Sequence, residues 1–330
     1  MEILEFTADD SDTIEAVVEL LNAAAKVDSP FSHPMTVSGY AGMIRFGWDG
    51  EPPRTFAARE SGALVGLVEI HTSEWDNTNL AWVGFVVHPD LRRLGRGSRL
   101  LEFAKEETLA MGRTSVGFDG WDIDATNGFA KTHGLPRKGS AINRRQILAL
   151  VERQAVETMY DEAATAASSY ELLRIAGHTP EDMLDAVAEM TAAINDAPTD
   201  DLDIEDEVFP KERIIGYEGA VEARGHRMYR VVARHRESGE LAGHTVVAVE
   251  LERPTIGHQH DTSVARAHRG HRLGLLLKAD MLRWLGESEP QLETIETWNA
   301  ESNDHMIEVN EKLGYQVLGR ELQFQINVSG

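Results

Sequence analysis

The sequence contains no cysteine among its 330 residues. Disulfide bonds, thiolate nucleophiles and thiolate-rich metal sites are therefore excluded. Basic residues are also scarce, because 32 Lys and Arg stand against 55 Asp and Glu, a formal net charge of −23. A chain this acidic repels nucleic-acid phosphates and anionic lipid surfaces, so we expect neither nucleic acid nor membrane as a partner, whereas a cationic substrate would be attracted. The alternative, that the acidity only keeps the protein soluble, stays open.

Long apolar runs and a secretory signal are missing as well. No apolar stretch approaches the ~18 residues that a membrane-spanning helix needs. The N-terminal sequence MEILEFTADD lacks the basic stretch and apolar core of a signal peptide. We therefore expect a cytoplasmic protein, and its length fits two domains of ~150 residues each.

One set of motifs occurs twice at a constant spacing. The turn Glu60-Ser61-Gly62 returns as Glu237-Ser238-Gly239, a shift of 177 residues (237 − 60 = 177). Further pairs with the same shift are Leu64 and Leu241, Gly66 and Gly243, Arg92 and Arg269, Gly97 and Gly274, and Trp121 and Trp298. A register kept over so long a stretch indicates two copies of one fold in tandem.

Each copy is predicted to be an α/β domain with the same order of elements. In the first copy we expect strands and helices in the order strand 3–7, helix 11–25, strands 54–59, 64–72 and 80–87, helix 97–111, strand 114–121 and helix 125–132. We expect an N-terminal domain over 1–151, a helical connector over 152–169 and a C-terminal domain over 170–330.

The segment between the strand and the helix near residue 90 has the features of a phosphate-binding loop. It reads Val87-His88-Pro89-Asp90-Leu91-Arg92-Arg93-Leu94-Gly95-Arg96-Gly97. The N–H groups at a helix start can bind a phosphate, and two glycines allow close approach of the backbone. Arg92, Arg93 and Arg96 add positive charge. A lone Gly-x-Gly is weak evidence, but here the flanking elements fit and the arrangement occurs twice.

These residues resemble the signature of the GNAT superfamily of acyl-CoA-dependent N-acyltransferases, Arg/Gln-x-x-Gly-x-Gly/Ala after a strand, which Arg92 to Gly97 matches completely. The resemblance covers both halves and is similar to the tandem arrangement of mycothiol synthase. It implies two GNAT domains, each a twisted, mostly antiparallel mixed sheet flanked by helices. It further implies that the loop amides hold the pyrophosphate of acetyl-CoA and that the preceding strand pairs with the pantetheine arm. The implied coenzyme-binding residues of the first copy are Phe85, Val86, Val87, Arg92, Arg93, Leu94, Gly95, Arg96, Gly97 and Ser98.

The second copy departs from the signature at one position. In Arg269-Gly270-His271-Arg272-Leu273-Gly274, Arg272 stands where the first glycine belongs, and its side chain could either obstruct or bind the pyrophosphate. The implied coenzyme-binding residues of this copy are Val264, Arg269, Gly270, Arg272, Gly274, Asn299 and Asn303. For Asn299 the alternative of a strand-end cap stays open.

The groups that move protons are harder to place. The family often uses a Glu on the strand before the loop and a Tyr on a later helix. The second copy offers Asp261, Asn310 at the Tyr position, and Tyr315 as catalytic candidates. In the first copy Ala130 takes the Tyr position, and the nearest carboxylates are expected by default to be solvated; these are Glu69, Glu74, Asp119 and Asp122.

Two further expectations concern metals and the acceptor. His258 and His260 have the spacing of a metal pair, but with no third ligand we expect no metal. By position in the family, Phe31, His33 and Met35 would form the acceptor wall, whereas Trp121 and Trp298 are expected in the core.

The resemblance implies an N-acetyltransferase that transfers the acetyl group of acetyl-CoA, as co-substrate, to a primary amine of a small, cationic molecule by direct attack. The alternative is a non-catalytic acyl-CoA-binding sensor or scaffold with one or both copies degenerate. The acceptor and the oligomeric state do not follow from the sequence.

Overall fold

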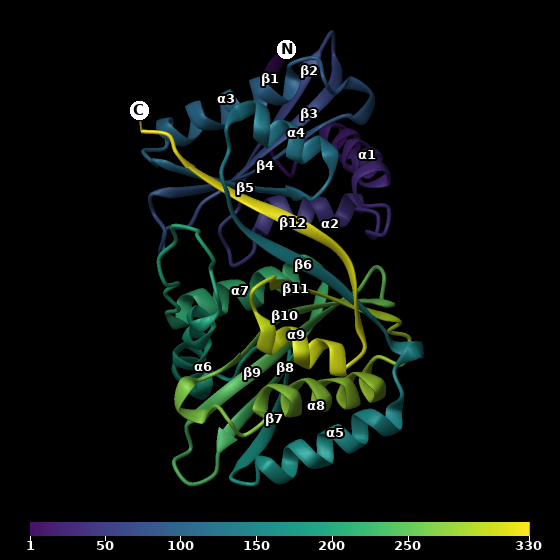
Figure 1. Cartoon of the computed structure of the whole chain (residues 1–330), viewed down its shortest axis with the longest axis vertical. Coiled ribbons are helices and arrows are strands. Elements are labelled where there is room, and N and C mark those ends of the chain that lie inside the picture. The colour runs from purple at the N-terminus through teal and green to yellow at the C-terminus, as the bar shows by residue number, and fades with distance from the viewer. Residues whose placement is uncertain (330) are drawn as a thin grey trace. The chain divides into compact units, whose positions relative to one another are not determined.

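The computed structural model describes residues 1–329, and the chain forms two compact units (Figure 1). Unit 1 contains Met1–Ala141, Thr199–Asp206 and the chain from Gly319 onward. Unit 2 contains Ile142–Pro198 and Glu207–Leu318. Each unit has its own set of parallel and antiparallel strands and its own helices, which confirms the predicted α/β class and the tandem repeat.

The sheet of unit 1 has the strand order β1-β2-β3-β4-β5-β12. Neighbouring strands are antiparallel except for the parallel pair β4 and β5. The strands are β1 (Glu2–Phe6), β2 (Arg54–Glu60), β3 (Ala63–His71), β4 (Leu80–Val87), β5 (Ser115–Trp121) and β12 (Tyr315–Asn327).

Unit 2 repeats this plan with the order β6-β11-β10-β9-β8-β7. Here β10 and β11 are the parallel pair, and β7 to β10 are antiparallel to one another in turn. The strands are β6 (Arg137–Ile147), β7 (Tyr170–Ala176), β8 (His226–His235), β9 (Leu241–Glu250), β10 (Ile256–Val264) and β11 (Thr294–Ala300).

Helices cover both faces of each sheet. In unit 1 they are α1 (Ser11–Asp28), α2 (Val37–Phe46), α3 (Arg96–Ala110) and α4 (Asp124–His133). In unit 2 they are α5 (Arg153–Ala166), α6 (Leu184–Thr191), α7 (Lys211–Ala223), α8 (Leu273–Ser288) and α9 (Asp304–Lys312). Five short 3-10 turns complete the described residues, namely η1 (Pro89–Leu91), η2 (Leu148–Leu150), η3 (Glu181–Met183), η4 (Ala192–Asp196) and η5 (Arg266–His268).

The two faces of the unit 1 sheet bury different cores. One cluster joins Val68 and Phe118 to residues of α3 and α4. The other joins Leu67 to residues of α1 and α2, including Tyr40. Because side chains alternate along a strand, a residue next to a member of the first cluster faces α1 and α2. The same rule identifies the carboxylates that share a face of the sheet.

The last strand of the chain pairs with a strand from the first half of the sequence. β12, yellow in Figure 1, lies beside the teal β5, and Glu321 is paired with Trp121. The ladder continues to Asn327, opposite Ser115. The sequence analysis did not indicate this partner. The end of the chain therefore supplies side chains to the sheet of unit 1.

The acidic segment Thr199–Asp206 also belongs to unit 1. The N–H of Asp203 donates to Oε1 of Gln325 (2.7 Å), and Nε2 of Gln325 donates to the carbonyl of Asp203 (2.8 Å). The predicted domain boundaries, 1–151 and 170–330 with a connector over 152–169, stay a prediction, and the compact units cross them. Within residues 1–329, no helix is both long and apolar enough to span a bilayer.

Candidate active site

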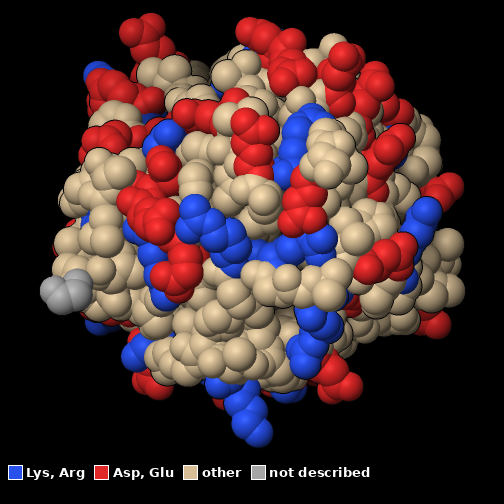
Figure 2. Space-filling model, turned by 90° about the horizontal axis from the view of Figure 1, so that it is seen from above, with Lys and Arg blue, Asp and Glu red and all other residues tan. Residues whose placement is uncertain are grey.

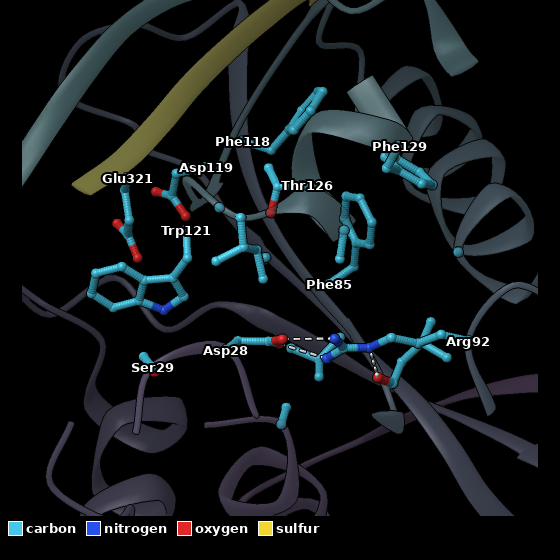
Figure 3. Close-up of a pocket in the computed structure, with 18 of the residues that line it drawn as sticks. Asp28, Ser29, Phe85, Arg92, Phe118, Asp119, Trp121, Thr126, Phe129 and Glu321 are labelled. Atoms are coloured by element: carbon cyan, nitrogen blue, oxygen red, sulfur yellow. Dashed lines mark hydrogen bonds and ion pairs between the residues drawn. The ribbon is translucent and has the colours of Figure 1, made fainter. Parts of the chain in front are cut away.

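A cavity of about 670 Å³ opens in unit 1 between the two layers of helices. It begins at the loop before α3 and passes the end of β4, where Phe85, Val86 and Val87 form its wall. Phe118 and Phe129 make its apolar part (Figure 3). The cavity ends at three polar groups of β5 and β12, which are Asp119, Trp121 and Glu321.

The cavity exists because two strands part. The parallel pairing of β4 with β5 runs from Leu80 opposite Ser115 to Trp82 opposite Gly117. Beyond this point β4 continues to Val87 and β5 to Trp121, with the cavity between them. The backbone of Phe85 to Val87 therefore lies along the cavity, where the resemblance places the pantetheine arm.

The loop before α3 turns sharply to present the helix start. Gly95 is the N-cap of α3 with a positive φ of 79°, and Arg93 also has a positive φ, 63°. In the first turn of an α-helix the N–H groups have no partner within the helix, so those of Arg96, Gly97 and Ser98 are available to an anion. Most predicted coenzyme-binding residues of this loop line the cavity, whereas Leu94 is an exposed side chain at the loop tip.

Two of the three arginines of this loop form ion pairs with carboxylates and thereby hold the loop in place. Nη1 and Nη2 of Arg92 donate to the two carboxylate oxygens of Asp28 at 2.7 and 2.6 Å, and Nε donates to the carbonyl of Val87 (Figure 3). Arg96 pairs with Glu60. The charges that Arg92 and Arg96 add to the loop are therefore balanced by the carboxylates of Asp28 and Glu60.

Asp119 and Glu321 form a carboxyl pair at the far end of the cavity. Figure 3 shows the two groups next to one another, beside Trp121. Trp82 donates from Nε1 to Oδ2 of Asp119 (3.0 Å). Burial, and then the neighbouring Asp119, raise the pKa of Glu321 to about 8. Burial also raises the pKa of Asp119, so the pair holds a proton near neutral pH.

Glu69 is a third carboxylate of unit 1 with a raised pKa, and burial is the cause. Its Oε1 accepts a hydrogen bond from the hydroxyl of Tyr40 (2.9 Å). The default expectation of an ordinary solvated group was therefore wrong for Glu69, whereas the side chain of Asp119 on β5 is exposed. It holds for Glu74, an exposed partner of Arg113, and for Asp122, an exposed partner of Asn127.

The predicted acceptor wall lies beside the carboxyl pair. His33 and Met35 line the cavity, and the ring of Phe31 contacts that of Trp121 edge-on at 5.1 Å. The two tryptophans expected in the core are elsewhere. Trp121 lines the cavity and Trp298 is 43% exposed, so the prediction of core packing was wrong for both.

The loop of unit 2 has the same backbone conformation as that of unit 1, but its glycine is at a different position. Gly270 has a φ of 86° and Arg272, the N-cap of α8, a φ of 56°, so the two left-handed positions match Arg93 and Gly95. The side chain of Arg272 lies 3.4 Å from Glu162. Arg269 repeats the clamp of Arg92, since it donates to the carbonyl of Val264 (3.0 Å) and to Asp196 (2.7 Å). Gly274 lies buried in the first turn of α8.

The asparagines of unit 2 contact protein groups. The side-chain carbonyl of Asn303 caps α9 by accepting from the N–H of Met306 (3.3 Å). Nδ2 of Asn310, a fully buried residue, donates to Oδ1 of Asn299 (2.7 Å). Asn299 itself lies within β11. Coenzyme binding by Asn299 and Asn303 stays a prediction.

Among the described residues, no hydrogen bond or ion pair is seen that joins the catalytic candidates of unit 2 to one another. Tyr315 is buried in the core beneath Lys278, whose Nζ lies 4.8 Å from the ring. Asp261 lies on β10 beside a register shift, and burial raises its pKa. Catalytic roles for Asp261, Asn310 and Tyr315 stay predictions.

The described part of the chain contains no group of three or more His, Asp or Glu side chains arranged to hold a metal ion. His258 hydrogen-bonds to Glu250 (2.8 Å), and His260 to the hydroxyl of Tyr217. Both histidines are thus engaged with protein groups.

Sequence reasoning missed Glu321. It lies on the last strand, far along the chain from Asp119, and nothing local in the sequence names β5 as its neighbour. Glu321 and Asp119 share a face of the sheet because Leu322 and Phe118 both lie in the core on the opposite face. No signal in a single sequence identifies such a pair.

Comparisons with known proteins identify the family and the fold of the chain. The family model described as Acetyltransferase (GNAT) family matches residues 15–130 and 192–315. A search of curated proteins finds no match. Among solved structures, the chain is similar to a tandem GNAT protein from the clavulanic acid biosynthesis pathway, with 26% identity and a TM-score of 0.82 over 100% of this chain and 99% of that one.

Two more distant structures show the fold alone. A GCN5-related N-acetyltransferase from Sphaerobacter thermophilus is 14% identical, with a TM-score of 0.65 over 99% of this chain and 95% of that one. N-myristoyltransferase from Saccharomyces cerevisiae is 12% identical, with a TM-score of 0.60 over 99% and 78%. The family model covers both halves of the sequence, and the chain belongs to the GNAT acetyltransferase family, with two copies of the fold in tandem.

Proposed function

We propose that unit 1 transfers an acetyl group from acetyl-CoA to a primary amine of a small, cationic molecule. The observation that carries the proposal is one cavity of about 670 Å³ with the α3 loop at one end and the Asp119–Glu321 pair at the other. A site for direct transfer needs both, since the donor must be held while a base takes the proton of the amine.

The α3 loop would hold the coenzyme. The N–H groups of the first turn of α3 would bind the pyrophosphate, and the Arg92–Asp28 clamp fixes the loop against the end of α1. The arm of the coenzyme would follow the open edge of β4, from Val87 to Phe85, into the apolar part of the cavity.

The carboxyl pair would handle the proton. As the amine nitrogen bonds to the thioester carbonyl carbon, the carbon–sulfur bond breaks and the coenzyme leaves as a thiolate, which becomes the thiol when the carboxyl pair passes on the proton that it takes from the amine. The amine must lose a proton, and the ionised form of the Asp119–Glu321 pair accepts it. A base with a pKa near the working pH is suited to this step. Because the chain lacks cysteine, no acyl-cysteine intermediate competes with direct attack.

The charge of the protein favours a cationic acceptor. The net charge is −23. On the face seen in Figure 2, Asp and Glu side chains are spread over the surface, while Lys and Arg gather toward its centre. Such a surface attracts amino sugars, polyamines and amino acid derivatives by long-range steering.

Unit 2 is better suited to binding than to turnover. Glu296 stands at the place of Asp119 in the repeat (296 − 119 = 177), but Nε of Arg145 donates to its Oε1 (2.9 Å). The carboxylate of Glu296 is therefore already engaged by a guanidinium of its own unit. The alternative of a non-catalytic acyl-CoA-binding protein therefore finds its support in this unit.

Activity should depend on pH through Glu321. Its pKa is about 8, so the ionised form that accepts a proton is lost as the pH falls through that value. We expect kcat to fall about tenfold per pH unit below pH 8 and to level off above it. Measurement of kcat between pH 6 and 10 with saturating acetyl-CoA checks this, and a flat profile between pH 6.5 and 8.5 would contradict it.

The proposal is tested by calorimetric titration of acetyl-CoA and by release of the coenzyme thiol in the presence of primary amines. A thiol reagent reports the coenzyme alone, because the protein has no cysteine. Binding with amine-dependent thiol release supports the proposal. Binding without release from any of a polyamine, an amino sugar and an amino acid amide favours the non-catalytic alternative.

A further inference from the structure

Tyr40 and Tyr217 occupy the same place in the two copies (217 − 40 = 177). Tyr40 on α2 is buried and donates to Oε1 of Glu69. Tyr217 on α7 hydrogen-bonds to Nδ1 of His260 on β10. Burial raises the pKa of Tyr217, and the charge of Asp261, the residue after His260, raises it further. Each tyrosine therefore lies next to an acidic side chain of its own sheet.

The acidic side chain comes from a different strand in each copy. Glu69 on β3 lies directly opposite Gly84 on β4. Their counterparts at the shift of 177 residues are Val246 (246 − 69 = 177) and Asp261 (261 − 84 = 177). In unit 2 the register shift of β10 falls between Gln259 and Thr262, opposite Val247 and Thr245, so Val246 faces the stretch that carries Asp261. One copy thus pairs Glu with Gly, and the other Val with Asp.

The exchange places the carboxylate of Glu69 next to Gly84 on the neighbouring strand. Gly84 lines the cavity, and Oε2 of Glu69 lies 3.4 Å from the place where a Cβ on Gly84 would be. The glycine therefore leaves room for the carboxylate, whose other oxygen is held by Tyr40. Burial raises the pKa of Glu69, because the protein removes water that would stabilise its charge, and a cationic partner would restore that stabilisation.

Glu69 shares its face of the sheet with the carboxyl pair. Val68 and Phe118 lie in the core under α3 and α4, and Leu322 lies there with them. The adjacent residues Glu69, Asp119 and Glu321 therefore face the other side, toward α1 and α2. The gap between β4 and β5 separates Glu69 from the pair.

We propose that Glu69 binds the acceptor, an extension that rests on the proposed function of unit 1. Its Oε2 accepts a hydrogen bond from the ammonium group of the acceptor at the edge of β4. Tyr40 fixes the carboxylate, and the Asp119–Glu321 pair across the gap takes the proton. Unit 1 carries this carboxylate on β3, as Glu69, whereas unit 2 carries it on β10, as Asp261.

Replacement of Glu69 by Gln should mainly weaken acceptor binding. Loss of one charge-assisted hydrogen bond is expected to raise the KM for the amine ~10- to 100-fold, with kcat changed by less than about threefold. The amine is the best substrate found among a polyamine, an amino sugar and an amino acid amide. Tyr40→Phe, which frees the carboxylate, should raise KM less. Glu102→Gln, on the exposed side of α3, is the control for a lost charge and should leave KM unchanged.

The repeat offers a rescue that a merely structural role would not show. Glu69→Val alone should raise KM at least as much as Glu69→Gln. Glu69→Val combined with Gly84→Asp copies the Val246 and Asp261 arrangement of unit 2, and we expect it to bring KM back to within about tenfold of the wild-type value. Circular dichroism and thermal unfolding identify any variant that does not fold.

Three outcomes decide the matter. A raised KM in Glu69→Gln together with recovery in the double variant supports the proposal. An unchanged KM in Glu69→Gln, with an active wild-type protein, overturns it and leaves the proposed function intact. If the wild-type protein binds acetyl-CoA but releases no thiol with any amine, the proposed function fails, and this inference fails with it.

Discussion

Replacement of Glu321 by Gln is expected to lower kcat about 100- to 1,000-fold, with the affinity for acetyl-CoA unchanged. The amide keeps the size and much of the hydrogen bonding of the carboxyl group but cannot take a proton. Glu321 lies at the end of the cavity away from the α3 loop, so the coenzyme-binding groups are untouched. The measurement is steady-state kcat at pH 8.5 with the best amine, together with the Kd of acetyl-CoA from calorimetry.

The same substitution should also change the pH profile. With Glu321 gone, Asp119 no longer faces a second carboxyl group, and the fall in kcat below pH 8 should move to lower pH or vanish. Asp122→Asn is the matched control, because Asp122 follows the same strand but is exposed and bonded to Asn127. A Glu321→Gln protein that turns over within threefold of wild type would show that the proton goes elsewhere.

Periodic and local signals in the sequence were sufficient for much of the fold. The register of the repeat, the glycine turns and the strand–loop–helix at Arg92 predicted two α/β domains and the loop that lines the cavity. Helices α2 and α7 were not predicted. The first contains Gly39 and Gly42 and the second Gly216 and Gly219, and glycine within a helix lowers its propensity. Packing of their apolar faces on the sheet outweighs that cost.

One signal for these helices was present in the sequence. Tyr40 and Tyr217 keep the shift of the repeat, and each lies on one of the two missed helices. A search for aromatic pairs at that shift would have indicated equivalent elements there. It would also have drawn attention to Glu69, the partner of Tyr40.

The Asp119–Glu321 pair could not be predicted from such signals, for a physical reason. Alternation along β12 predicts which residues share a face of a strand, but the strand partner is set by the whole sheet. β12 pairs with β5, so Glu321 meets Asp119 only in the folded chain. The raised pKa values of both groups are likewise a property of the cavity and not of the residues.

Replacement of Gly97 by Trp is expected to abolish acetyl-CoA binding in unit 1 and to reduce turnover to the background rate. Gly97 is in the first turn of α3 and lines the cavity, so an indole there covers the N–H groups that would face the pyrophosphate. A Cβ at this position lies 3.1 Å from the ring of Phe129, so the side chain is forced toward the cavity wall. Calorimetry gives the loss of one site, and thiol release gives the loss of turnover.

Gly274→Trp is the matched control in unit 2. It changes the equivalent position of the repeat (274 − 97 = 177), where a Cβ has no heavy atom within 4 Å. We expect this variant to keep full turnover, whatever it does to binding in unit 2, because the proposed reaction belongs to unit 1. Should the contact with Phe129 destabilise Gly97→Trp, Gly95→Arg serves in its place, since Arg272 already adopts the left-handed conformation at the equivalent position. Turnover lost in Gly274→Trp and kept in both variants of the first loop would move the reaction to unit 2.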